Sequence, residues 1–324
     1  MALPNAIQRI GVVGILPLPA VLAMFFDVAD KIVTISHPSM LAAQHGPLAQ
    51  LYPEILKADD SFNPGLDVDT TALKKLAPDV VFYRAEATAM QQKLRAAGFT
   101  AVGISTESWN HDPIETLRQW IMLLEKIFPK NAKAQIVADY NIAMRDRVQQ
   151  RVSQISPEQR KTVFFLSQYS ATRCATSGRT HWGQYWAETV GAKNVVNDPG
   201  GAIQVTMAQI NQWNPEIIFI TNFTPAQPTD LYNNTIGDYD WSKVAAVKNK
   251  QAYKMPLGMY RSYAPGGDTP LTLLWMAKTV YPTQFADINI IEETKTYYKK
   301  VFNVTLTDQQ AAKIFKPSSA ASAY

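Results

Sequence analysis

A repeated segment constrains the fold of this chain more than any other feature. Residues 66–83 read LDVDTTALKKLAPDVVFY and residues 203–220 read IQVTMAQINQWNPEIIFI, and they align without a gap at an offset of 137 positions, the separation of Pro78 and Pro215. In each copy an acidic residue and four apolar or aromatic residues follow the proline. This pattern predicts a short helix, a proline that ends it, and a strand buried on both faces. Two copies predict two similar lobes.

Strand-like and helix-like segments alternate around each copy. The predicted strands are residues 9–14, 32–35, 80–83, 101–104, 162–167, 174–176, 217–221 and 253–255, and the predicted helices include 85–97, 180–190 and 270–280. Such alternation is typical of an α/β fold. We therefore expect two lobes, each with a mainly parallel sheet flanked by helices.

One long helix is expected between the halves. Residues 131–155 contain neither proline nor glycine, and Pro129 and Ser156-Pro157 bound them. A single helix of about 25 residues would be roughly 37 Å long, which makes it a stiff strut between the lobes. The chain is thus predicted to divide into an N-terminal lobe (1–129), a linking helix (130–156) and a C-terminal lobe (157–324).

Composition argues against several other kinds of protein. The 31 Lys and Arg residues against 27 Asp and Glu leave a charge of only +4, spread without a basic run, so nucleic-acid binding is not expected. Cys174 is the single cysteine, so no internal disulfide can form, and the four histidines lack the spacing of a structural zinc site.

No apolar run reaches the length of a membrane span. Residues 10–26 lack the basic start and cleavage site of a signal peptide, so an exported form would have lost its signal before Met1 of this sequence. The tail, residues 316–324, is small and polar, and we expect it to be disordered.

Four stretches together resemble the periplasmic binding proteins of the siderophore, haem and cobalamin class. They are residues 71–84 (TALKKLAPDVVFYR), 175–196 (ATSGRTHWGQYWAETVGAKNVV), 210–222 (INQWNPEIIFITN) and 255–282 (MPLGMYRSYAPGGDTPLTLLWMAKTVYP). The resemblance implies a ligand held between two lobes by loops at the carboxyl ends of strands, little hinge motion, and delivery to the permease of an ABC importer. Members carry ferric siderophores, haem, cobalamin, nickel complexes or molybdate-type oxyanions.

The chain departs from this class at the positions that dock on the permease. Cobalamin and siderophore members carry a glutamate seven residues before the proline of each repeat, whereas this chain has Thr71 and Ala208 there. Docking would then use neighbours such as Asp67, Asp69 or Glu54, or the permease differs.

Three residues of the N-terminal lobe are candidates for the ligand site. Tyr83 and Arg84 directly follow a predicted buried strand, where an unpaired arginine would face the cleft mouth; a salt bridge to a neighbouring acid is the alternative. By the resemblance, Arg84 stands where the cobalamin protein stacks a tryptophan on its ligand. Trp109 follows another strand, and packing at a helix start is its alternative role.

The first group of candidates in the C-terminal lobe surrounds the predicted strand 174–176. Arg173, Arg179 and His181, beside Tyr169, would suit an anionic ligand, because guanidinium groups match carboxylate, catecholate and oxyanion oxygens. His181 is also a candidate metal ligand, although a hydrogen-bonding role is the commoner one. Cys174 is expected to be buried and inert.

The second group lies further along the chain, in the loop 258–263. Tyr260, Arg261 and Tyr263 lie in a loop where no apolar packing calls for them. Asn222 follows the strand of the second repeat, one position after the equivalent of Arg84, and could donate a hydrogen bond to a ligand. A Tyr260 phenolate would suit Fe(III), and packing of the tyrosines on the next helix is the alternative. Replacing Arg84 or Arg261 with alanine is expected to weaken binding by about 1–3 kcal/mol with little effect on folding.

These features predict a monomeric transport protein of the periplasm that is not an enzyme and has no cofactor. Its ligand would be a ferric siderophore or a similar metal complex; a molybdate or tungstate oxyanion, a nickel chelate or a corrinoid is the alternative. An α/β enzyme is the competing hypothesis, but the glycine-rich phosphate-binding motifs, a convincing triad and paired carboxylates are all missing from the sequence.

Overall fold

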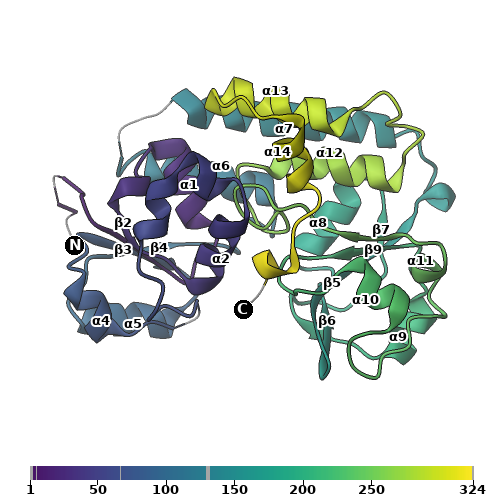
Figure 1. The fold of residues 1–324 in the computed structure, drawn as a ribbon, viewed down its shortest axis with the longest axis horizontal. Helices are drawn as coiled ribbons and strands as arrows, with labels where there is room; N and C mark the ends of the chain where they lie inside the picture. Colours follow the sequence, from purple (N-terminus) through teal and green to yellow (C-terminus); the bar gives the residue numbers. More distant parts are fainter. Residues whose placement is uncertain (1–2, 5, 66, 129–131, 323–324) are drawn as a thin grey trace.

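The computed structural model describes residues 3–4, 6–65, 67–128 and 132–322, with only the backbone for 132–134. Leu66 and residues 129–131, with the expected start of the linking helix, lie outside these ranges. Figure 1 shows two lobes side by side, spanned along the top by helices α7 and α13. Each lobe has its own sheet with helices around it, so the predicted fold class is confirmed.

The sheet of the N-terminal lobe is entirely parallel, in the order β2-β1-β3-β4. Its strands are β1 (Ile10–Val13), β2 (Ile32–Thr34), β3 (Val80–Arg84) and β4 (Ala101–Ile104). Its helices are α1 (Leu18–Phe26), η1 (Ala29–Lys31), α2 (His37–His45), α3 (Leu48–Leu51), η2 (Pro53–Lys57), α4 (Thr70–Lys75), α5 (Thr88–Ala96) and α6 (Pro113–Leu124). All four strands predicted in this half are present.

The sheet of the C-terminal lobe is mixed, in the order β10-β9-β5-β6-β8, with β7 paired to β5. Strands β10, β9, β5 and β7 run parallel, whereas β6 is antiparallel to both β5 and β8. The strands are β5 (Thr162–Ser170), β6 (Arg173–Thr176), β7 (Lys193–Asn194), β8 (Ile203–Gln204), β9 (Ile217–Ile220) and β10 (Ala252–Lys254). The helices are η3 (Pro157–Gln159), α8 (Trp182–Thr189), α9 (Met207–Trp213), α10 (Pro228–Asn233), α11 (Ala245–Lys248) and α12 (Thr269–Val280).

The repeat is visible in backbone detail. Helices α4 and α9 begin at equivalent caps, Asp69 and Thr206, whose side chains accept hydrogen bonds from the first turn. The residues before the two prolines, Ala77 and Asn214, both take a left-handed conformation with φ of 42°. This turn redirects the chain from each helix into the buried strand that follows.

The acidic residue after each proline also has the same role in both copies. The Asp79 carboxylate accepts a hydrogen bond from Arg9 N at 2.8 Å, and Glu216 accepts one from Thr162 N at 2.9 Å. Arg9 and Thr162 stand at the start of the first strand of each sheet. Each acid therefore ties its own strand to the neighbouring one, which explains why the repeat includes it.

The linking helix α7 spans Ala132–Val152, close to the prediction, and ends three residues earlier than expected. Its 21 residues give a length of about 32 Å. It packs against α12 and α6 and so joins the two lobes along one side. The division of the chain into lobes and linking helix at residues 129 and 156 stays a proposal.

The last part of the chain returns to the N-terminal lobe, which chain order alone does not suggest. Helices α13 (Ile290–Phe302) and α14 (Asp308–Ile314) and the turn η4 (Ser319–Ser322) share one apolar cluster with α1. Ala321 and Ser322 are buried, and η4 packs on α2. The expectation of a disordered tail is therefore wrong for these residues, because apolar contacts with α2 hold them.

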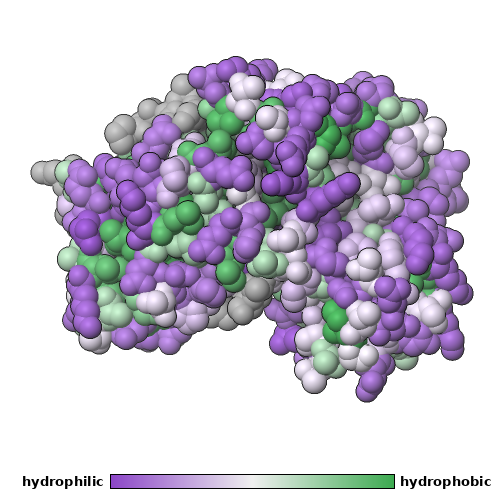
Figure 2. All heavy atoms as spheres, viewed as in Figure 1, coloured by the Kyte–Doolittle hydropathy of each residue, from purple (hydrophilic) through white to green (hydrophobic). Residues whose placement is uncertain are grey.

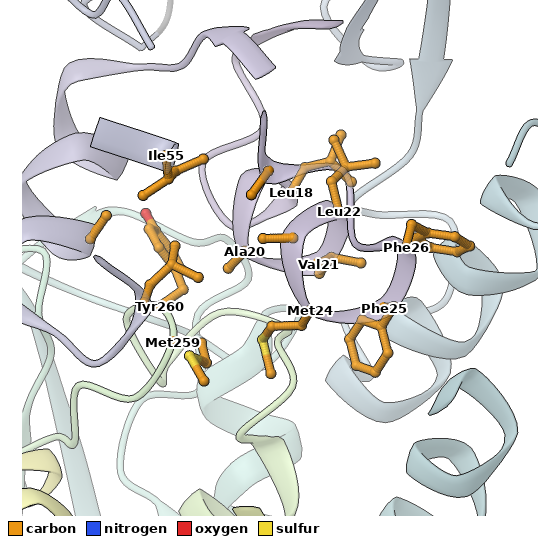
Figure 3. Packing of buried hydrophobic residues seen from close by; sticks show 14 of the residues in the cluster. Leu18, Ala20, Val21, Leu22, Met24, Phe25, Phe26, Ile55, Met259 and Tyr260 are labelled. Atoms are coloured by element: carbon orange, nitrogen blue, oxygen red, sulfur yellow. The ribbon is translucent and has the colours of Figure 1, made fainter. Parts of the chain in front are cut away.

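Helix α1 was not predicted, because prolines and glycines interrupt its neighbourhood. Pro17 and Pro19 fall at its start, where a missing N–H costs nothing, and all nine of its residues are buried. Figure 3 shows Met24 of α1 close to Met259, which belongs to the C-terminal lobe. This helix thus forms part of the contact between lobes.

The outer surface carries both polar and apolar side chains. The face in Figure 2 is mostly polar, with apolar side chains in small separate patches, and its outline is indented between the lobes at the lower edge. Within the described ranges, no helix is long and apolar enough to cross a membrane.

Candidate functional site

A pocket of about 510 Å³ lies between the lobes. Ser108, Trp109, Asn110, Asp112 and Glu115 line it from the N-terminal lobe, and Arg179, His181, Gln184, Tyr185 and Glu188 line it from the C-terminal lobe. Three predicted site residues, Trp109, Arg179 and His181, are thereby brought together from opposite sides. In parallel sheets such loops at strand ends are the usual place for ligands.

The N-terminal wall is a strained loop between β4 and α6. Asn110 and His111 have φ of 51° and 54°, two successive left-handed residues. Asparagine tolerates this conformation, whereas for histidine it is unfavourable. The loop ends at Asp112, which caps α6 by accepting hydrogen bonds from Ile114 N and Glu115 N at 2.8 and 3.0 Å. The cap and the turn together direct the His111 ring toward the other lobe.

The C-terminal wall begins where β6 ends. His181 stands at the N-cap position of α8, and its Nδ1 lies 3.2 Å from Ser177 Oγ. Its ring stacks on Tyr263 with a centroid distance of 6.2 Å and lies 4.8 Å from Trp182. This packing fixes the orientation of the ring.

His111 and His181 face each other across the lobes, with ring centroids 4.6 Å apart. Burial lowers the pKa of His181 to about 3, with the His111 and Arg84 charges adding to the effect. Burial and Arg84 also lower the pKa of His111. Both imidazoles are therefore neutral at neutral pH, with a lone pair on one nitrogen of each ring.

Arg84 lies beside the pocket without lining it. Its guanidinium pairs with Glu86 at 3.3 Å and with Glu107, and its side chain is 37% exposed. The alternative of a salt bridge to a neighbouring acid therefore describes Arg84 well. Its charge still acts on His181, which lines the pocket, and on His111, whose ring lies next to that of His181.

The loop 258–263 is buried behind the pocket. Tyr260, Arg261 and Tyr263 are all at most 5% exposed. Arg261 Nη2 donates to the Pro38 carbonyl of the other lobe at 3.3 Å, and its guanidinium lies 5.4 Å from the Phe223 ring centroid. A fully buried, lobe-bridging arginine supports the fold itself. We therefore expect Arg261→Ala to affect folding, contrary to the expectation from the sequence.

Asn222 and Tyr263 have similar supporting positions. Asn222 is buried and its Nδ2 donates to the Met255 carbonyl at 3.0 Å. The Tyr263 hydroxyl lies next to Ser177 and Gly183 under the start of α8. Burial raises the pKa of this hydroxyl, so it stays protonated.

The structure leaves three other predicted residues away from the pocket. Tyr83 packs under α5 in the N-terminal lobe. The Tyr169 hydroxyl donates to the Ile236 carbonyl at 3.0 Å and accepts from Trp241 Nε1 at 2.8 Å, in a separate cluster of the C-terminal lobe. Arg173 is exposed at the first position of β6. Cys174 is buried, as expected, and burial raises its pKa to about 12.

Sequence reasoning missed His111, Asp112 and Tyr185. The Asp112-Pro113 pair is a recognisable helix start, which could have placed Asp112 at the cap and His111 just before it. Tyr185 is on the first turn of α8; burial and the Asp112 charge across the pocket both raise its pKa.

Comparison with known proteins identifies the family of the chain. The sequence profile of the periplasmic binding protein family matches residues 22–257. The chain belongs to this family. Among solved structures, a periplasmic solute-binding protein of Veillonella parvula superposes with a TM-score of 0.80 at 26% identity, covering 97% of this chain and 93% of that one.

Other relatives of this periplasmic binding protein differ in what they bind. The molybdate-binding protein MolA of Haemophilus influenzae is 24% identical over 269 residues, 76% of this chain and 73% of MolA. CeuE of Helicobacter pylori, solved as a nickel–histidine complex, superposes with a TM-score of 0.77 at 22% identity, covering 97% and 96% of the two chains. The relatives fix the class of protein and leave the cargo open.

Proposed function

We propose that this protein captures a small metal complex in the pocket between its lobes and delivers it, in the periplasm, to the permease of an ABC importer. The observation that supports this most is the pairing of Arg179 and His181 from one lobe with Trp109 from the other around one cavity. An arginine can pair with acidic oxygens of a chelator, and an aromatic ring can cover its apolar edge. Binding and release need no bond to break, so we propose no enzymatic activity.

The size and charge of the pocket narrow the choice of complex. A volume of about 510 Å³ is in the range for a compact organic ligand, which favours a small chelate over a corrinoid. Asp112, Glu115 and Glu188 line the pocket together with Arg179. This mixture of charges suits a chelate that carries both signs better than a ligand with acidic oxygens alone.

A molybdate-type oxyanion is the second candidate. The relation to MolA favours it, as does the positive charge of Arg84 next to the two histidines. The carboxylates of Asp112 and Glu188 in the pocket oppose it, because a like charge near an anion lowers affinity, whereas Glu115 is paired with Arg118 at 2.6 Å.

Tryptophan fluorescence can test the proposal, since Trp109 lines the pocket and Trp182 adjoins it. We expect saturable quenching by one of four ligands: nickel(II)–histidine, a ferric siderophore, molybdate or cobalamin. Arg179→Ala should weaken that binding by about 1–3 kcal/mol, the scale of a charged hydrogen bond. Arg173→Ala is the matched control outside the pocket. No quenching by any of the four would count against the proposal.

Docking on the permease is proposed to use the two repeat helices. Thr71 on α4 and Ala208 on α9 are both exposed, and Figure 1 shows these helices at the lower edge of the two lobes. Asp67 and Asp69 lie next to α4 and are exposed as well. A charge reversal at Asp67 and Asp69 that slows uptake without changing ligand affinity would support this face.

A further inference from the structure

We infer that His111 and His181 bind the metal ion of the cargo directly, as a two-imidazole site that spans the lobes. This inference rests on the proposed function and narrows it: the cargo would be a complex of a divalent transition metal whose chelator leaves coordination positions open. A ferric siderophore that fills every position, or an oxyanion, would not need these rings.

The distance between the rings fits shared coordination. Metal–nitrogen bonds of about 2.0–2.1 Å hold the centroids of two neighbouring imidazoles on one ion roughly 4.5–5 Å apart. The centroids of His111 and His181 are 4.6 Å apart, with 36° between the ring planes. The two rings therefore have the spacing needed to bind one ion, although they come from different lobes.

Each ring is held in place by its surroundings. Ser177 Oγ occupies Nδ1 of His181, which leaves Nε2 for an ion, in the way that outer hydrogen bonds orient metal-binding histidines. A Cβ built on Gly201 would lie 2.4 Å from Cδ2 and 2.6 Å from Nε2 of His181, so only a glycine lets the backbone pack this closely against the ring and hold it. On the other side, the left-handed backbone of His111 is a local cost of the kind that collects at binding sites.

A site with two imidazole donors suits a chelated metal ion as the cargo. Among the described residues, no group of three His, Cys, Asp or Glu side chains is placed to hold a metal. Two imidazoles would complete a coordination sphere only with a chelator that supplies the remaining ligands. Imidazole suits Ni²⁺, Cu²⁺ and Zn²⁺.

The decisive experiment compares three histidine variants in the full chain. His111→Asn keeps a residue that tolerates the left-handed backbone, and His181→Gln keeps a polar side chain of similar size. His45→Asn is the matched control, because His45 is exposed on α2. The probe is nickel(II) with two equivalents of L-histidine, followed through Trp182, whose ring centroid lies 6.1 Å from that of His111 and 4.8 Å from that of His181.

We expect His111→Asn and His181→Gln each to weaken binding of this probe at least tenfold, and His45→Asn to change it less than twofold. Copper(II) bound with unlabelled L-histidine to protein labelled with ¹⁵N-histidine should show coupling to ¹⁵N in its electron paramagnetic resonance spectrum. That coupling separates protein imidazoles from those of the chelator. Circular dichroism verifies that each variant is folded, and the coupling test needs no variant.

Two results would overturn the inference. Quenching by a ferric siderophore or molybdate that persists in both histidine variants, with no ¹⁵N coupling, would remove the metal site and leave the proposed transport function standing. Absence of binding by nickel–histidine, copper–histidine, molybdate, siderophore and cobalamin alike would remove both.

Discussion

Between the lobes, the junction around α1 is filled with apolar side chains, whereas the pocket lined by Arg179 and His181 is a polar cavity. In this apolar junction, α1, the loop 257–264 and helix α13 bury Phe25, Met259 and Tyr297 in one cluster. Its buried carboxylate, Asp268, accepts hydrogen bonds from Tyr298 Oη at 2.6 Å and Met259 N at 2.6 Å. The pocket instead has a strained loop and opposed histidine rings.

The difference separates stability from binding. The apolar junction buries apolar surface and pairs its buried polar groups. Both favour a single arrangement of the two lobes. We expect such packing to keep the two pocket walls at a set distance. The pocket walls, in turn, contribute little apolar contact of their own. Mutations in the junction should therefore change stability most, and mutations in the pocket should change affinity most.

The largest expected effect is in the junction. Phe25→Ala should lower the free energy of unfolding by about 3–5 kcal/mol, because Phe25 is fully buried and packs edge-on against Phe302 with a centroid distance of 6.2 Å. Urea denaturation would measure it. Leu56→Ala is the control, since Leu56 is 45% exposed and should cost less than about 0.5 kcal/mol. Equal losses in the two variants would contradict the account of the junction.

Arg261→Ala should have the next largest effect on stability, about 2–3 kcal/mol. The guanidinium is fully buried and reaches from the C-terminal lobe to the Pro38 carbonyl, which would lose its donor. The measurement is again denaturation, with Arg179→Ala as an exposed arginine for comparison. A stable Arg261→Ala protein that binds poorly would instead place Arg261 in the binding site.

Stability should also depend on pH through His181. Its pKa is about 3 in the folded chain against an ordinary 6.5, so as pH falls below 6.5 the unfolded chain gains a proton that the folded chain does not. Stability is therefore lost as pH falls through this window, by about 1–2 kcal/mol between pH 7 and pH 5. Denaturation curves of the wild type and of His181→Gln at both pH values isolate the pH-dependent stability that His181 contributes. An identical pH dependence in the two proteins would show that His181 is not buried as described.

The smallest effect is expected at Arg173. This residue is exposed at the start of β6 and lines no part of the pocket, so Arg173→Ala should change stability by less than about 0.5 kcal/mol. Ligand affinity should change less than twofold. Isothermal titration with the ligand identified by fluorescence would check both this variant and Arg179→Ala. A large loss in the Arg173 variant would extend the site toward the β5–β6 hairpin.

Local signals in the sequence were sufficient for the two lobes and for many of their elements. The repeat predicted the helix, the proline and the buried strand in both halves, and the structure has Ala77 and Asn214 in the same left-handed turn. Helix α7 was predicted from an uninterrupted run between prolines. Helix α1 was not predicted. Proline is compatible with a helix only in its first turn, and the sequence does not show that the helix begins at Pro17 and Pro19.

The amino-acid sequence by itself determined that the chain forms two α/β lobes joined by a helix, because periodicity, caps and prolines act within a few residues of one another. Only the tertiary structure decided that His111 meets His181, that Arg261 is buried, and that the end of the chain closes over α2. These contacts join residues 70 or more positions apart, and their distances depend on how the two lobes pack. No local pattern encodes that packing.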